Sequence, residues 1–345
     1  MKTIFAVDDS DTNLAMAEEA LETHYRILPM PSAAKMFSFL EKMKPDLILL
    51  DIEMPEINGL EALKRLKAHR LYADIPVIFL TGRIDTAIET QGFELGAVDF
   101  ITKPFSASVL LRRIKAHLDM DELIRERTAH LRRLQNGLVH VLADMVENRD
   151  KGTGGHIERT TSYIKILIKA MEERSLYVDE LRTWDMETTN SSARLHDVGK
   201  IVIPDIILNK PGGLTDEEFE IMKSHVTEGE RIIDKVIERT GEEDFLWNAK
   251  LFAGYHHERW DGTGYPRGLK GTEIPLQGRI MAVADVYDAL VSKRPYKEAL
   301  PDDKVVSIIT SESGKYFDPK IVDVFLEVKD LFKEVTMGLG QTRQG

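Results

Sequence analysis

The chain has 345 residues, more than twice the length of a common domain, so we expect two packed domains. The sequence contains no cysteine, which excludes disulfides, thiolate metal sites and cysteine nucleophiles. The net charge of −12 argues against a nucleic-acid polymer as partner. No apolar stretch has the length of a membrane span and no signal peptide is recognisable, so we expect a cytoplasmic protein without a membrane partner.

Short apolar runs alternate with amphipathic segments in residues 1–118. The runs have the length and composition of buried strands, and they cover residues 3–7, 46–50, 75–80 and 99–101. This alternation predicts an α/β domain built on a doubly wound parallel sheet.

Turn signals disappear after Ser106, and the pattern predicts a helix that ends near Asn148, with residues 119–148 as a linker. Apolar residues recur at heptad positions in Ile124, Leu131, Leu138 and Met145, with Leu134 and Val141 between them. This spacing favours a short coiled coil, and we expect a homodimer through the linker helix. Arg127 interrupts the seam, so a simple amphipathic linker is the alternative.

Residues 149–334 have almost wholly helical periodicity, which predicts an all-α domain with one glycine-rich loop at 258–272. Thr215 and Glu218 have the spacing of a capping box and predict the start of a helix. We expect residues 335–345 to form a disordered tail.

Polar residues follow the predicted strands of the first domain, namely Asp8, Asp9, Asp51, Thr81 and Lys103. Because ligands of open α/β sheets bind beyond the carboxyl ends of the strands, we expect these side chains to converge. Carboxylates suit Mg²⁺, while an ammonium and a hydroxyl suit the oxygens of a phosphoryl group carried by a carboxylate. Any one of the aspartates alone would more often be a helix cap.

In this order, and with Pro55 and Gly59 after Asp51, the segment resembles the receiver domain of two-component response regulators. The resemblance implies a sensor histidine kinase as partner. It also implies that Asp51 accepts a phosphoryl group, that Asp8 and Asp9 help to hold Mg²⁺, and that Thr81 and Phe100 reposition on phosphorylation.

Five of the ten histidines lie in the second domain, close in sequence to other polar residues. Neutral imidazoles and carboxylates are the ligands that a cysteine-free protein offers to first-row divalent metals. His196 and Asp197 are adjacent, and an aspartate beside a histidine can bridge two metals. The remaining histidines, which we expect to be core or surface residues, are His24, His69, His117, His130 and His140.

Residues 194–200 (RLHDVGK) and 256–266 (HHERWDGTGYP) resemble the HD-GYP family, and the similarity covers nearly all of residues 137–334. The resemblance implies a metal-dependent phosphodiesterase that hydrolyses the bacterial messenger cyclic di-GMP to pGpG or GMP. Together with the receiver, it implies that phosphorylation of Asp51 modulates the hydrolysis.

At the matching positions, the resemblance implies seven metal ligands: His156, His196, Asp197, His225, His256, His257 and Asp285. Asp197 is the expected bridge between two transition metals, with Fe or Mn as the expected elements. His156, His196 and Asp285 would complete one metal, and His225, His256 and His257 would complete the other.

Four further residues are candidates for contacts around this site. Lys200 is expected to offset charge on the substrate's phosphate, with an ordinary surface lysine as the alternative. Arg294 and Lys297 match the family's second basic pair and are expected at the phosphates, unless they form a solvated helix end. Tyr265 either stacks on a guanine or packs beneath its loop.

The metal count depends on a position four residues before His156. Family members with a third metal supply a carboxylate there, whereas this chain has Gly152, so we expect two transition metals. We expect Glu147 to orient a ligand or close a helix. Two other functions stay open: hydrolysis of another nucleotide phosphoester, such as pGpG or a mixed cyclic dinucleotide, and a catalytically silent signalling adaptor.

Overall fold

The structure is a computed structural model that describes residues 1–69, 71–82, 86–150, 155–241, 244–293 and 298–338. The chain divides into two compact units, Met1–Leu131 and Arg132–Gly345. In this described part of the chain, every helix is too short or too polar to cross a lipid bilayer.

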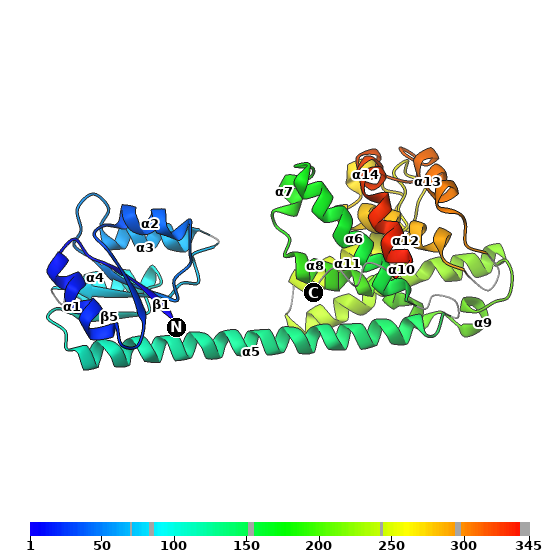
Figure 1. The fold of residues 1–345 in the computed structure, drawn as a ribbon. Coiled ribbons are helices and arrows are strands. Elements are labelled where there is room, and N and C mark those ends of the chain that lie inside the picture. The colour runs from blue at the N-terminus through cyan, green and yellow to red at the C-terminus, as the bar shows by residue number, and fades with distance from the viewer. Residues whose placement is uncertain (70, 83–85, 151–154, 242–243, 294–297, 339–345) are drawn as a thin grey trace. The chain divides into compact units, whose positions relative to one another are not determined.

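The first unit contains one parallel five-stranded sheet in the order β2-β1-β3-β4-β5 (Figure 1). Its strands are β1 (Thr3–Val7), β2 (Arg26–Met30), β3 (Leu47–Asp51), β4 (Val77–Thr81) and β5 (Asp99–Thr102). The sequence pattern located four of these strands and missed β2. That strand lies at the sheet edge and exposes Arg26 and Pro29, so it lacks the continuous apolar run of a central strand.

Helices cover both faces of the sheet, as the doubly wound fold predicts. They are α1 (Asp11–Leu21), α2 (Ala33–Leu40), α3 (Gly59–Ala68), α4 (Thr86–Glu94) and the first turns of α5 (Ala107–Glu147). Leu14 of α1 and Ile114 of α5 are buried in the core on one face. Met36 of α2 and Leu63 of α3 are buried on the other. The predicted fold class of this unit is confirmed.

The second unit is helical throughout its described elements, apart from isolated bridges. The elements are α6 (His156–Glu173), α7 (Val178–Leu181), α8 (Met186–Ser192), η1 (Ala193–Leu195), η2 (Val198–Val202), α9 (Asp205–Leu208), α10 (Asp216–Thr240), α11 (Asp244–Tyr255), η3 (Gly271–Glu273), α12 (Leu276–Val291), α13 (Asp302–Ser311) and α14 (Pro319–Thr336). The predicted all-α class is therefore confirmed.

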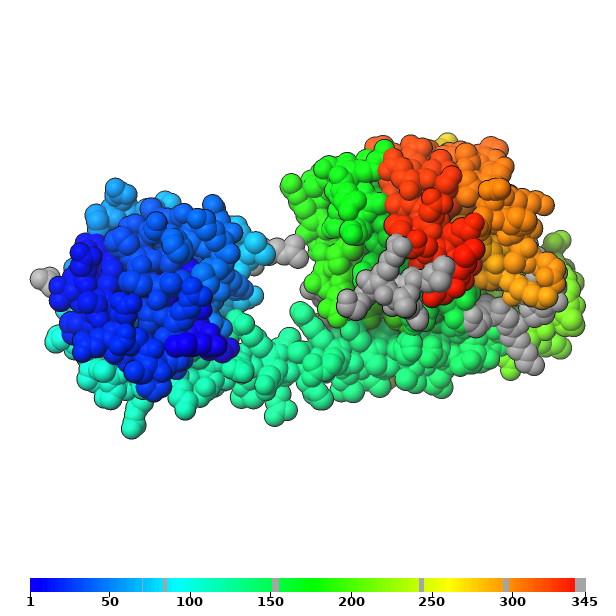
Figure 2. Space-filling model, viewed as in Figure 1, coloured from blue at the N-terminus to red at the C-terminus, as the bar shows by residue number. Residues whose placement is uncertain are grey.

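The core of the second unit joins α6, α12 and α14 through aromatic rings. The ring of Tyr163 stacks on Phe332 at 4.5 Å and meets Tyr287 edge-on at 5.1 Å. Figure 2 shows α14 in red on the surface of this unit, beside the orange segment that contains α13. This packing holds α6 and α12, which carry candidate ligands, in a fixed relation.

Two helix ends test the sequence pattern. The predicted capping box is present, since Glu218 N donates to the Thr215 hydroxyl and Thr215 N donates to the Glu218 carboxylate. Helix α14 continues to Thr336, past residue 334, where the disordered tail was expected to follow. The hydroxyls of Thr336 and Tyr163 share a hydrogen bond of 2.8 Å, which anchors this last turn. Residues 339–345 lie outside the described part.

Candidate functional site

Three carboxylates of the first unit meet beyond the ends of β1 and β3. Ligand oxygens of Asp8, Asp9 and Asp51 lie within 4.8 Å of one another. Asp8 and Asp51 are buried and Asp9 is exposed. Because β1 and β3 are paired in parallel, with Val7 opposite Leu50, their following aspartates reach the same edge. The oxygen-only donor set fits Mg²⁺.

Lys103 follows β5 and lies between two of these carboxylates. Its Nζ is 2.6 Å from Asp8 Oδ2 and 2.8 Å from Asp51 Oδ1. Burial raises the pKa of Asp51, although the neighbouring Lys103 acts in the opposite direction. The ammonium therefore stabilises a buried carboxylate that is expected to carry a phosphoryl group.

The two other receiver residues lie at neighbouring strand ends. Thr81 is the buried last residue of β4, and its carbonyl accepts a hydrogen bond from Lys103 N at 2.7 Å. Phe100 of β5 is buried against Phe79 and Phe93, with ring centroids 5.2 and 4.9 Å away. Their movement on phosphorylation stays a prediction.

The candidate ligands of the helical unit form two groups. His156, His196 and Asp285 are one group, which we name group 1, and His225, His256 and His257 are the other, which we name group 2. Within each group, one ligand atom per residue lies within 4.8 Å of the others. The structure thus brings together, in the predicted combinations, residues that are up to 129 positions apart in the sequence.

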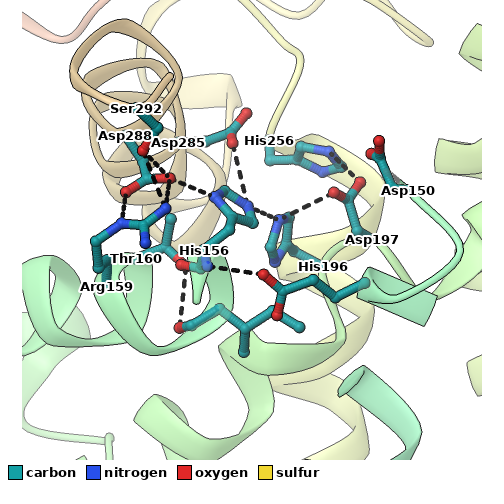
Figure 3. A network of polar contacts seen from close by, with 12 residues as sticks. Asp150, His156, Arg159, Thr160, His196, Asp197, His256, Asp285, Asp288 and Ser292 are labelled. Carbon is teal, nitrogen blue, oxygen red and sulfur yellow. Dashed lines mark hydrogen bonds and ion pairs between the residues drawn. The ribbon is translucent and has the colours of Figure 1, made fainter. Parts of the chain in front are cut away.

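Asp197 lies between the two groups and turns one oxygen towards each. Its Oδ2 is 3.4 Å from His196 Nε2, and its Oδ1 is 3.8 Å from His256 Nε2 (Figure 3). The same Oδ1 is 3.4 Å from His225 Nε2. This is the arrangement that a carboxylate bridging two cations requires.

The histidine rings are held by hydrogen bonds at Nδ1. Three of them face main-chain carbonyls within 3.0 Å: His196 faces Ala193, His225 faces Met222, and His256 faces Phe252 and Ala253. A carbonyl only accepts, so Nδ1 carries the hydrogen and each neutral ring keeps a lone pair at Nε2. His156 and His196 have their Nε2 atoms 3.4 Å apart, as do His225 and His256. Two neighbouring Nε2 atoms with free lone pairs can bind the same metal ion.

The lowered pKa values of the group 2 rings favour cation binding. Burial lowers the pKa of His225, lowers that of His256 to about 3, and lowers that of His257 well below its usual value. These imidazoles are therefore neutral near pH 7, the form that binds a metal. Burial opposes the charged form of His156 too, but neighbouring carboxylates, chiefly Asp288 and Asp285, outweigh it and raise its pKa.

Lys200 and Asp197 form an ion pair at the centre of the site. Lys200 Nζ is 2.8 Å from Asp197 Oδ2 and 3.0 Å from Asp150 Oδ2. Burial alone would raise the pKa of Asp197, but the neighbouring Lys200 ammonium acts in the opposite direction, and the pKa is held well below the usual range. Asp197 is therefore an anion, and Lys200 is a half-buried cation paired with it.

Gly199 allows η2 to approach α10 closely. A Cβ atom at this position would lie 1.8 Å from the His225 carbonyl oxygen and 2.5 Å from Gly229 N. No other residue fits this contact without a shift of the backbone. The close approach is what brings Asp197, two residues earlier, against His225 of α10.

Buried polar contacts fix the glycine-rich loop beside group 2. Glu258 accepts hydrogen bonds from Arg267 N at 2.7 Å and from Leu269 N at 3.0 Å. The ring of Tyr265 stacks on His257, with centroids 4.8 Å apart and planes 24° from parallel. One face of Tyr265 thus packs within the site, and a contact of this residue with substrate stays a prediction.

Sequence reasoning missed part of the hydrogen-bond network behind His156. It singled out Glu147, whose carboxylate accepts a hydrogen bond from His156 N at 2.7 Å, in agreement with an orienting role. It did not single out Asp288 or Arg159, and the only signal for Asp288 was its place three residues after Asp285. The predicted contacts Arg294 and Lys297, and Gly152 of the metal count, lie outside the described residues.

Comparisons with protein families agree with this geometry. The family model of the response regulator receiver domain matches residues 4–115, and the HD domain model matches residues 140–321. The fold and the two matches define a response regulator with an HD-type output domain.

Two relatives match nearly the whole of this chain. A Vibrio cholerae protein named as a probable cyclic di-GMP phosphodiesterase is 40% identical over 96% of this chain and 79% of its own length. The cyclic di-GMP phosphodiesterase response regulator RpfG of Xanthomonas campestris is 35% identical over 96% of this chain and 89% of its own length. The chain therefore belongs to the family of response regulators that carry a phosphodiesterase HD domain.

A third relative matches a smaller part of this chain. The 3'3'-cGAMP-specific phosphodiesterase 2 of Vibrio cholerae is 39% identical over 61% of this chain and 38% of its own length.

Proposed function

We propose that this protein is a two-component response regulator whose helical domain hydrolyses cyclic di-GMP at a dinuclear metal centre. The observation that carries the proposal is the position of Asp197, with one carboxylate oxygen facing each of two histidine groups. The substrate follows from the names of the full-length relatives, which are 35% to 40% identical to this chain. Hydrolysis of one phosphodiester bond would give pGpG, and hydrolysis of both would give GMP.

The donor sets fit the expected ions. Groups 1 and 2, with Asp197 between them, would hold two divalent transition metals, Fe or Mn. When bound, such ions polarise a phosphate oxygen and lower the pKa of a water that attacks phosphorus. In the receiver domain, the three aspartates would hold Mg²⁺.

The chain's own residues would orient and neutralise the substrate. Lys200, held between Asp197 and Asp150, would stabilise negative charge on a non-bridging phosphate oxygen. Arg294 and Lys297, outside the described residues, are proposed for the phosphates of the bound dinucleotide. Tyr265, stacked on His257, would form one wall of the site and is the candidate for a contact with guanine.

The test of the proposed substrate is a nucleotide panel. Protein loaded with Mn²⁺ is incubated with cyclic di-GMP, 3'3'-cGAMP and pGpG, and the products are separated by chromatography. We expect the highest kcat/KM with cyclic di-GMP. The relative specific for 3'3'-cGAMP makes the mixed cyclic dinucleotide the second candidate. Metal-loaded protein that hydrolyses none of the three would instead be a signalling adaptor.

Phosphorylation is proposed to occur at Asp51 and to modulate the hydrolysis. Asp51→Asn should abolish the incorporation of phosphate from acetyl phosphate and Mg²⁺, because an amide is not the carboxylate nucleophile that the reaction needs. Radiolabelling or intact-protein mass spectrometry measures the incorporation. Asp74→Asn, which changes an exposed aspartate of the same domain, is the control and should be labelled like the wild type. Labelling of the Asp51 variant would place the acceptor elsewhere.

The proposed homodimer forms through α5. Residues Leu110, Ile114 and Leu118 of this helix are buried in the first unit, and Val139, Ala143 and Val146 are buried in the second. The apolar heptad residues have exposed fractions of 53% to 63%, and they are Ile124, Leu131, Leu134, Leu138, Val141 and Met145. A seven-residue repeat on a continuous helix is self-complementary, so the partner it fits is α5 of a second copy.

Charged residues at the apolar heptad positions of α5 should separate the dimer. The double variant Leu131→Asp and Leu138→Asp would place carboxylates in the seam, and we expect a monomer at about 10 µM, where the wild type is a dimer. Light scattering after size exclusion measures the mass. Leu71→Asp changes an exposed leucine outside α5 and should leave the dimer intact. A monomeric wild type would favour the simple linker helix.

A further inference from the structure

Asp288 bonds to a candidate metal ligand without belonging to either ligand group. It lies on α12, one helical turn after Asp285, and only 1% of its surface is exposed. Its Oδ2 accepts a hydrogen bond from His156 Nδ1 at 2.8 Å (Figure 3). Because an ionised carboxylate only accepts, His156 carries a hydrogen at Nδ1, and its neutral ring has the lone pair at Nε2.

Arg159 fixes the plane of the Asp288 carboxylate. Its Nε donates to Oδ1 at 2.6 Å and its Nη2 donates to Oδ2 at 2.9 Å. Nη2 also donates to the Ser292 hydroxyl at 3.0 Å. Asp288 thus forms a two-pronged ion pair with Arg159, and both of its oxygens are held in place.

The ring of His156 is consequently aimed at group 1. Its Nε2 lies 3.5 Å from Asp285 Oδ1 and 3.4 Å from His196 Nε2. The main chain of His156 is anchored separately, through its hydrogen bond to Glu147. Asp288 fixes the orientation of the ring and Glu147 fixes the start of the helix that carries it.

The hydrogen-bond acceptor at Nδ1 of His156 differs from the acceptors at Nδ1 of three other histidines. His196, His225 and His256 donate from Nδ1 to neutral carbonyls of their own helical turns. A charged carboxylate makes the imidazole that it contacts a stronger electron donor than a carbonyl does. Among these four histidines, only His156, a member of group 1, donates from Nδ1 to a carboxylate.

We propose that Asp288 is the positioning residue that sets the metal affinity of group 1, acting through His156 without touching metal or substrate. This inference rests on the proposed dinuclear site. The ion at group 1 depends on Asp288, whereas the ion at group 2 does not. The two ions of the site therefore differ in how easily a single substitution removes them.

The test is calorimetric titration of the full chain with Mn²⁺, in excess Mg²⁺ so that the receiver carboxylates are already occupied. Asp288→Asn keeps the size of the side chain and removes its charge. We expect the affinity for one of the two Mn²⁺ ions to fall by about 10- to 100-fold and the affinity for the other to stay unchanged. Equal affinities in the variant and the wild type would overturn the inference.

Asp318→Asn is the matched control. Asp318 is another buried aspartate of the same domain, and it accepts a hydrogen bond from Arg279 at 2.9 Å without contacting groups 1 or 2. Its loss should lower thermal stability and leave both Mn²⁺ affinities unchanged. If both variants lose Mn²⁺ affinity alike, Asp288 supports only the fold and the inference is wrong.

Two further readouts separate positioning from folding. At a pH where the His156 ring is neutral, the ¹⁵N shifts of the metal-free wild type should show the Nδ1–H tautomer, and Asp288→Asn should shift that ring towards the Nε2–H tautomer. Should Asp288→Asn fail to fold, Arg159→Lys, which keeps the charge but not the two-pronged contact, should weaken the same single Mn²⁺ site. A wild type that binds no Mn²⁺ in the helical domain would instead refute the proposed function.

Discussion

Asp197→Ala should abolish hydrolysis, with a fall in kcat/KM of about 1000-fold or more, equivalent to ~4 kcal/mol of transition-state stabilisation. The physical reason is that this carboxylate faces both histidine groups, so its loss removes a ligand from both ions at once. We also expect the variant to retain less than about a tenth of the transition metal held by the wild type. Elemental analysis and product chromatography measure the two losses.

A surface aspartate provides the control for this substitution. Asp323 is exposed on α14, and Asp323→Ala should leave both the metal content and kcat/KM at the wild-type values. Near-normal turnover by Asp197→Ala at full metal occupancy would show that the two histidine groups do not share a carboxylate bridge.

Gly199→Ala should disrupt the site without removing any ligand. The added Cβ would overlap the His225 carbonyl oxygen and force η2 away from α10. Overpacking of this kind costs about 1–3 kcal/mol, which corresponds to a fall in Tm of roughly 2–12 °C for a domain of this size. Since Asp197 moves with η2, we expect metal affinity to fall by about 10-fold or more.

Gly213 offers the same substitution in open space. A Cβ atom there would meet no heavy atom within 4 Å, and its backbone is not left-handed, so Gly213→Ala should change neither Tm nor metal affinity. Thermal unfolding measures the Tm of both variants, and Mn²⁺ titration measures their metal affinity. If Gly199→Ala bound metal as tightly as Gly213→Ala, the close approach of η2 and α10 would not be what positions Asp197.

The fold was predictable where a strand is buried along its whole length or where the sequence has helical periodicity and helix-start signals. Central strands such as β3 are buried at every residue and give an unbroken apolar run, and the capping box at Thr215 marks the start of α10. Strand β2 was missed because an edge strand tolerates Arg26 and Pro29 on its exposed positions. The last turn of α14 was missed because a hydroxyl contact with Tyr163, far away in the sequence, holds it.

The sequence was sufficient to predict which residues form the site, but not which hydrogen bonds hold them. Histidines and aspartates at recognisable positions indicated the ligands, because metal chemistry restricts the residue types. The partner of each ring nitrogen was not predictable, since it depends on packing between elements. Asp288 contacts His156, which lies 132 positions away in the sequence. No local pattern distinguishes Asp288 from an aspartate that caps a helix or lies on the exposed face of one.

The most direct test of the dinuclear site is the anomalous scattering of crystals loaded with Mn²⁺. The account predicts two peaks per chain in the helical domain, one at group 1 and one at group 2, each about 2.0–2.3 Å from an oxygen of Asp197. A single peak, or two peaks that do not share Asp197, would contradict the proposed centre. Three peaks would contradict the count of two that the glycine at position 152 predicts.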